Sequence, residues 1–120
     1  MTFVDYEQAK WLKRIGFNKK CKYYYDFIGD VCSSDNETNW NISNESLYSR
    51  PEQHQVVNWL LETHNILIFP DVQFKKGVGS YWWNIKGDGI NRFSKLINRF
   101  NSLPEVYSAA FNYMLDNNLI

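Results

Sequence analysis

The sequence is poor in the residues that usually build catalytic and metal centres, with two histidines and two cysteines among 120 residues. His54 and His64 are ten residues apart. On one helix, side chains at that spacing point about 80° away from each other, so they cannot share a metal ion. Cys21 and Cys32 lack the spacing of zinc ligands, and no further Cys or His pair completes a set of four. We therefore expect a protein that is not an enzyme, with no catalytic residue, no metal site and no cofactor.

Long hydrophobic runs are also missing, and the longest continuous one covers only residues 66–69. A membrane-spanning helix needs about 18 or more apolar residues, so we expect no membrane span. Residues 1–7 lack the basic start and apolar stretch of a signal peptide. These features predict a cytoplasmic protein in which Cys21 and Cys32 are reduced thiols.

The net charge is zero, with 13 basic and 13 acidic residues, but the charges are unevenly distributed. Basic residues dominate residues 1–22 and 75–99, whereas residues 23–49 carry five acidic residues and no Lys or Arg. The acidic residues do not follow the regular spacing of a calcium loop. We interpret them as a solvated acidic surface that binds protein.

Hydrophobic residues make up 44% of the chain and aromatic residues 18%, enough for a core built largely from rings. The length fits one domain spanning residues 1–120. In the first half, Thr2 and Asp5 resemble a capping arrangement for a helix over residues 3–15. A strand follows at 21–28. Residues 29–47 have the composition of a long loop that holds one short extended piece at 39–43.

The motif Ser-x-Pro-Glu occurs twice, at Ser49 and at Ser102, and is typical of a helix start with Ser as the N-cap. It predicts helices over residues 50–64 and 103–117, the first of them ended by Asn65. Between these helices, residues 66–74 and 80–86 are expected to form a hairpin around a turn at 75–79. Pro70 places its strand at an edge, because proline cannot donate to the sheet.

After a second turn at residues 87–89, the spacing of Ile90, Phe93, Ile97 and Phe100 favours one or two helical turns. The complete order of elements predicts an α+β fold, with helices packed on one face of a short, mostly antiparallel sheet.

The hairpin is the candidate interaction surface, because basic residues alternate there with aromatic ones, as a nucleic-acid-stacking or protein-binding surface requires. Tyr81 and Trp83 share one face of the strand and Trp82 lies on the other. We therefore expect at least one of these rings to meet solvent or a partner. The predicted partner-binding residues are Lys75, Lys76, Tyr81, Trp82, Trp83, Lys86 and Arg92.

Three stretches, residues 6–17, 48–60 and 100–115, together resemble small phage and prophage proteins of AT-rich bacterial genomes. The resemblance implies an accessory phage protein acting in the bacterial host cytoplasm. Small phage proteins without enzymatic signatures often inhibit host defence, anti-CRISPR proteins among them, so the resemblance implies an inhibitor of that kind.

Three hypotheses follow for the function. The first is a non-enzymatic inhibitor that binds a bacterial defence protein or its guide RNA complex, with a possible RNA contact. The second is a small-ligand binder, such as a sponge for a nucleotide signal, in which rings stack on a base. The third is an enzyme whose site has no recognisable motif.

Overall fold

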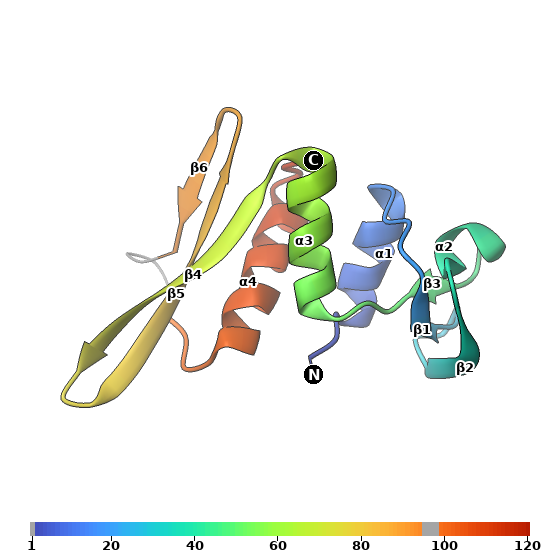
Figure 1. Ribbon diagram of the computed structural model, residues 1–120, viewed down its shortest axis with the longest axis horizontal. Helices are drawn as coiled ribbons and strands as arrows, with labels where there is room; N and C mark the ends of the chain where they lie inside the picture. The colour runs from blue at the N-terminus through green and yellow to red at the C-terminus, as the bar shows by residue number, and fades with distance from the viewer. Residues whose placement is uncertain (1, 95–98) are drawn as a thin grey trace. The chain divides into compact units, whose positions relative to one another are not determined.

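The protein is α+β, as predicted, with helices and antiparallel strands in both halves of the chain (Figure 1). A computed structural model describes residues 2–94 and 99–120. The chain divides into two compact units, Met1–Glu52 and Gln53–Ile120. One sheet was expected, whereas each unit contains a three-stranded sheet of its own. That residues 1–120 form one domain stays a prediction.

The N-terminal unit combines an antiparallel sheet of order β2-β1-β3 with two helices. Its elements are α1 (Tyr6–Arg14), β1 (Cys21–Tyr25), β2 (Val31–Thr38), α2 (Trp40–Ser43) and β3 (Tyr48–Ser49). The predicted helix start at residues 2–3 is wrong, because Asp5 caps α1. The Asp5 carboxylate accepts from the amide of Gln8 at 2.8 Å, and the Gln8 side chain accepts from the amide of Asp5 at 3.1 Å. Upstream, Val4 donates to the carbonyl of Pro51, which holds that residue outside the helix.

The prediction of a long loop over residues 29–47 is wrong for most of that segment. Residues 31–38 form β2, whose polar composition suits the edge of a sheet. The expected extended piece at 39–43 is instead the short helix α2, capped by Asn39. Trp40 fixes this helix, because its indole nitrogen donates to the carbonyl of Cys21 at 2.8 Å and its ring stacks on Tyr24 at 4.1 Å.

A single lysine organises the remaining turn at residues 44–47. The ammonium of Lys13 donates to the carbonyls of Asn44, Glu45 and Leu47 at 2.8–2.9 Å, so all three of its protons are used. It also lies 5.0 Å from the centre of the Tyr48 ring. Desolvation by burial lowers the pKa of Lys13, and the nearby Glu45 carboxylate opposes this shift. One basic residue of the segment 1–22 therefore has a structural role.

The C-terminal unit contains two helices and an antiparallel sheet of order β4-β5-β6. Its elements are α3 (Gln53–His64), β4 (Leu67–Lys75), β5 (Val78–Gly87), β6 (Ile90–Phe93) and α4 (Leu103–Asp116). The helical turns expected over residues 90–100 are wrong at 90–93, which form β6; Ile97 lies outside the described residues. Asn65, with φ of 53°, follows α3 in the left-handed conformation, as predicted.

Helices cover one face of this sheet, as predicted. Side chains alternate along β5, so Trp83 and Ile85 share a face. The Trp83 ring meets that of Tyr113 on α4 at 4.7 Å, and Ile85 is fully buried. The two helices are linked by the Gln53 side chain, which donates to the carbonyl of Pro104 at 3.0 Å. The opposite face of the sheet carries no helix within the described residues of this unit.

Pro70 lies on the edge strand β4, as predicted. Its partner across the sheet is Trp83, whose backbone amide and carbonyl both bond to Ser94 on the other side of β5. The pair Pro70–Trp83 is therefore not a hydrogen-bonded pair, and the backbone nitrogen of Pro70 faces the free edge. Pro70 removes a donor from that edge and makes it a poor template for another strand.

Candidate interaction surface

The structure divides the seven predicted contact residues into groups rather than bringing them together. Lys75 and Lys76 lie at the turn of the β4–β5 hairpin, whereas Lys86 lies near the other end of β5. Eight residues separate Lys86 from Val78, the partner of Lys75, which corresponds to roughly 26 Å along a strand. Arg92 is on β6, opposite Ile85. All four basic side chains are exposed, but they do not form one cluster. That they contact a partner stays a prediction.

At least one ring among Tyr81, Trp82 and Trp83 was expected to meet solvent or a partner, and neither tryptophan meets solvent. Trp82 and Trp83 do point to opposite faces, yet they are only 7% and 5% exposed. Trp83 is covered by α4, as described above. On the other face, the guanidinium of Arg99 lies 5.8 Å from the centre of the Trp82 ring. Tyr81 is half-buried.

Arg99 reaches the Trp82 ring because the chain returns to β5 at residues 99–100, and no local sequence pattern predicts this return. Phe100 pairs with Tyr81 through two backbone hydrogen bonds of 2.9 and 2.7 Å, which bring residues 99–100 back to β5. Sequence alternation can assign a strand residue to a face. It cannot show that a segment about 18 residues later covers that face.

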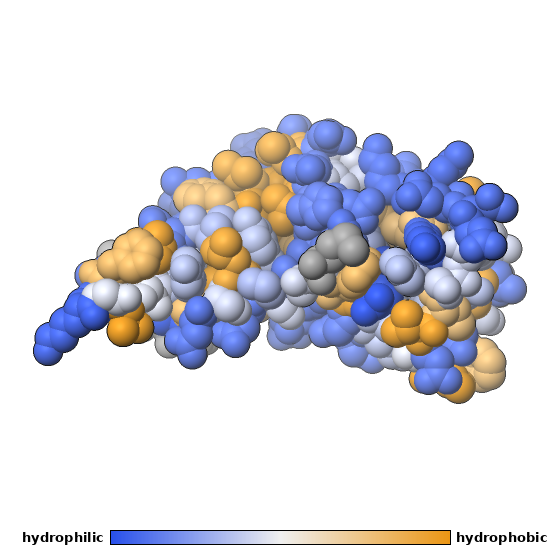
Figure 2. Space-filling view, turned by 60° about the horizontal axis from the view of Figure 1, so that its bottom comes forward, coloured by the Kyte–Doolittle hydropathy of each residue, from blue (hydrophilic) through white to orange (hydrophobic). Residues whose placement is uncertain are grey.

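Three exposed apolar side chains lie near the end of the β4–β5 hairpin. This end extends beyond β6 and α4 (Figure 1). Phe74 is 68% exposed, Val78 66% and Val72 38%. With the two lysines they form what we term the hairpin tip: Val72, Phe74, Lys75, Lys76 and Val78. At the left end of Figure 2, hydrophobic side chains gather beside a projecting hydrophilic one.

The turn of this hairpin has an unusual residue in a strained position. Lys76 and Gly77 have φ of 52° and 77°, and residues 75 and 78 pair across them, which is the pattern of a two-residue type I′ turn. Such turns favour Asn-Gly, because both residues need positive φ. A lysine at the first position costs stability and places a cation at the apex. The sequence predicts a turn over residues 75–79; the structure confirms a turn there and confines it to Lys76 and Gly77.

Three residues of the hairpin tip, Val72, Phe74 and Val78, were not among the predicted contacts. Phe74 lies over Gly79, where an added Cβ would come within 3.2 Å of the Phe74 ring. Glycine thus leaves room for the ring to lie flat on the hairpin. The signal that could have identified these residues is their distance from the third strand, since a two-stranded ribbon beyond a sheet has no core to bury them.

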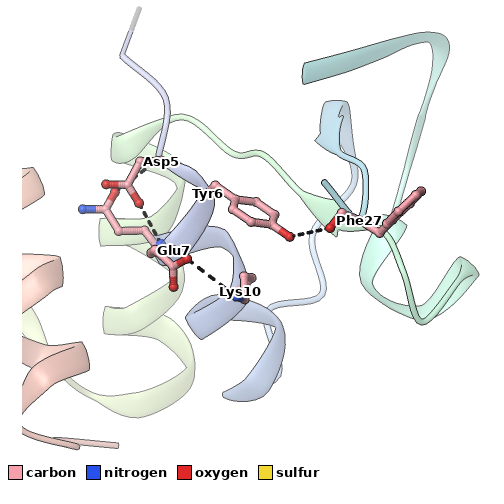
Figure 3. Close-up of polar contacts among 6 residues, drawn as sticks. Asp5, Tyr6, Glu7, Lys10 and Phe27 are labelled. Carbon is pink, nitrogen blue, oxygen red and sulfur yellow. Dashed lines mark hydrogen bonds and ion pairs between the residues drawn. The ribbon is translucent and has the colours of Figure 1, made fainter. Parts of the chain in front are cut away.

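A second exposed apolar turn joins β1 to β2 in the N-terminal unit, where Phe27 is 70% exposed and Ile28 63%. The Asp26 carboxylate accepts from the amides of Ile28 and Asp30, both at 3.0 Å. The Tyr6 hydroxyl donates to the carbonyl of Phe27 at 3.0 Å (Figure 3). Of the five acidic residues expected in a binding surface, Asp26 is half-buried, and the exposed ones are Asp30, Asp35, Glu37 and Glu45. Their binding of a protein stays a prediction.

The two cysteines lie on neighbouring strands but not opposite each other. Cys21 pairs with Thr38 and Cys32 pairs with Tyr24, so the two lie about three residues apart along β1, roughly 10 Å. Both are free thiols in this register, which is too far apart for a disulfide. Burial raises the pKa of Cys21 to about 12, with a smaller contribution from the Glu37 carboxylate.

Among residues 2–94 and 99–120, no group of three or more His, Cys, Asp or Glu side chains is placed to hold a metal ion. His54 is exposed on α3, and the His64 ring packs against Trp59 at 4.9 Å. No helix in the described part of the chain is both long and apolar enough to cross a membrane. Comparisons of the chain with protein-family models, with curated proteins and with solved structures found no match.

Proposed function

We propose that the protein is a non-enzymatic inhibitor that binds a bacterial defence protein or its guide RNA complex through the hairpin tip. The observation that carries the binding role is the exposure of Phe74 and Val78 beside Lys75 and Lys76. Phe74 lies on one face of the ribbon and Val78 on the other, because Phe74 pairs with Gly79 and Val78 with Lys75. Exposing large apolar side chains costs free energy unless a partner covers them, so a hairpin end that exposes them is typical of a docking surface. The defence setting rests on the resemblance to phage accessory proteins.

The chemistry of the hairpin tip favours a protein surface as its direct contact. Aromatic anchors that enter a pocket supply much of the binding energy at protein interfaces, and Phe74 is the exposed anchor here. The adjacent lysines complement an acidic rim and accelerate association more than they add affinity. The rigid two-residue turn limits the ordering cost that a flexible loop would have on binding.

The alternative of a nucleotide-signal sponge has less support. Of the rings at the predicted hairpin surface on which a base could stack, both indoles are buried. The enzyme alternative finds no support in the arrangement of titratable side chains described above.

The test is protection of a phage that a CRISPR system targets, measured as plaquing efficiency in cells that express the chain. We expect the wild-type chain to raise plaquing. The double variant Lys75→Glu/Lys76→Glu should lose at least about tenfold of that protection, equivalent to about 1.4 kcal/mol of binding. The matched control is Lys19→Glu/Lys20→Glu, which reverses two adjacent exposed lysines in the other unit.

Phe74→Ala separates apolar contact from charge. It should also reduce protection, while circular dichroism and the unfolding midpoint stay near wild type, because the ring is 68% exposed. Absence of protection by the wild-type chain would reject the defence setting. Full protection by a folded tip variant, or a loss in the Lys19→Glu/Lys20→Glu control as large as that in the tip variant, would reject the hairpin tip as the contact.

A further inference from the structure

The face of the β4-β5-β6 sheet opposite the helices carries rings and cations that the proposed function does not use. Along β5, Asn84 and Lys86 point away from the face that holds Trp83 and Ile85. Their neighbours across the sheet share this side, and together they form what we term the open sheet face: Leu67, Phe69, Asn84, Lys86, Asn91 and Phe93. Phe93 is 48% exposed and Leu67 39%.

Two rings flank an amide in the central row of this face. Phe69 on β4 and Phe93 on β6 both pair with Asn84, so the rings stand on strands separated by β5. Neighbouring strands are about 4.8 Å apart, which places the two backbones about 10 Å apart. The Asn84 side-chain amide donates to the backbone carbonyl of Phe69 at 3.4 Å, and this bond directs the side chain toward β4.

Cations accompany these rings. The ammonium of Lys86 lies 5.8 Å from the centre of the Phe69 ring and is exposed. Arg99, also exposed, lies over the neighbouring Trp82. The single acidic group contributed to this side by the paired strands is Asp71, which lies opposite Trp82, one row toward the hairpin tip. The rows of Phe69 and of Leu67 are therefore free of carboxylates from the described strand residues.

We propose that the open sheet face binds single-stranded RNA. Bases stack on Phe93 and Phe69, because aromatic rings on an exposed sheet accept the flat face of any base. Lys86 and Arg99 meet the phosphates, to which their charge is complementary. The amides of Asn84 and Asn91 lie beside the rings, where each can both donate to and accept from a ribose 2′-hydroxyl, a group that DNA lacks.

This site is separate from the hairpin tip, so it can be tested without the defence assay. The probe is a fluorescein-labelled oligouridylate of about 12 nucleotides, within the range that one small domain covers, and binding is followed by fluorescence anisotropy. We expect the wild-type protein to bind it, with affinity falling as salt rises. The labelled oligodeoxythymidylate of equal length should bind more weakly.

Phe93→Ala is the main variant, because removing a ring that is 48% exposed leaves the core intact. We expect it to weaken RNA binding by about tenfold or more. Phe93→Leu keeps an apolar side chain without a ring and should be nearly as weak, which identifies stacking as the cause. Lys86→Gln should reduce the dependence of the affinity on salt. Phe74→Ala, the exposed ring of the hairpin tip, is the control and should bind RNA as wild type does.

Three results would overturn this proposal: no anisotropy change with wild-type protein at low salt, equal RNA affinity of wild type and folded Phe93→Ala, or equal affinity for the RNA and DNA probes. The proposed function is judged separately, because Phe74→Ala should lose phage protection while it retains RNA binding. Absence of RNA binding by a wild-type chain that protects phage would reject the open sheet face alone. Absence of phage protection by a wild-type chain that binds RNA would reject the proposed function alone.

Discussion

The Tyr6 hydroxyl donates a hydrogen bond of 3.0 Å to the carbonyl oxygen of Phe27, and so links α1 to the turn between β1 and β2. The same ring approaches Gly29, where an added Cβ would lie 3.2–3.4 Å from three ring atoms. Gly29 has φ of 90°, a conformation that other residues rarely adopt. The turn therefore depends on the hydrogen bond from Tyr6 and on the positive φ that Gly29 adopts.

Two substitutions separate these contributions. Tyr6→Phe removes only the hydroxyl and should cost about 0.5–1.5 kcal/mol of stability, toward the lower end because the bond is exposed. Gly29→Ala should cost more, since it adds backbone strain and crowds the Tyr6 ring. Urea unfolding at constant slope measures both losses. A Gly29→Ala variant as stable as wild type would contradict the tight turn.

The strained apex of the hairpin leads to the second prediction. Lys76→Asn places a residue that tolerates positive φ at the first position of a type I′ turn, and should raise stability by about 1 kcal/mol. Lys75→Asn makes the same chemical change at a strand position and is the matched control. It should bring no gain, because asparagine is disfavoured in strands. Equal effects of both changes on the unfolding midpoint would show that charge, not backbone strain, is responsible.

The third prediction concerns thiol reactivity. With its pKa raised to about 12 by burial, Cys21 holds almost no thiolate at pH 8, and only the thiolate attacks a disulfide reagent. A folded protein should therefore show one fast thiol, at the partly exposed Cys32, and one slow thiol, at Cys21. Cys32→Ser should abolish the fast phase, and urea should make the slow thiol react quickly. Two fast phases in the folded protein would contradict the burial of Cys21.

In the β4–β5 hairpin, the local structure could be predicted from the sequence, whereas the burial of one ring could not. Its strands, its turn and the edge position of Pro70 follow from local chemistry, namely strand propensity, a Lys-Gly turn and a proline that cannot donate. The burial of Trp82 does not follow, because Arg99 approaches its ring only after the chain has left and rejoined the sheet. The polar strand β2 was missed for a similar reason. Its pairing with β1 supplies the order that its Ser- and Asn-rich composition does not suggest.

The two copies of Ser-x-Pro-Glu give the sharpest contrast, because one local motif has two outcomes. Ser102 caps α4 as predicted, and its hydroxyl accepts from the amide of Glu105 at 3.4 Å. Ser49, predicted as the cap of the next helix, is instead buried in β3, and α3 begins at Gln53. Its hydroxyl accepts from the amide of Trp40 at 3.1 Å. At Ser49, a hydrogen bond to a residue distant in the sequence thus replaces the predicted helix cap.

This contrast gives the last prediction. Ser102→Ala removes an exposed cap and should cost about 0.5–1 kcal/mol, the lower part of the range for caps, because its bond is long. Ser49→Ala leaves the Trp40 amide without its acceptor in a partly buried site, and should cost about 1–3 kcal/mol. The larger loss should therefore come from the serine that does not cap a helix.

Hydrogen exchange identifies the mechanism behind each loss. In Ser49→Ala the amide of Trp40 should exchange faster while the amides of α3 keep their protection, because the serine supports α2 and not α3. In Ser102→Ala the amide of Glu105 should exchange faster and Trp40 should be unchanged. If Ser49→Ala instead deprotected the first turn of α3, Ser49 would act as its N-cap in solution, and the start of that helix at Gln53 would be wrong.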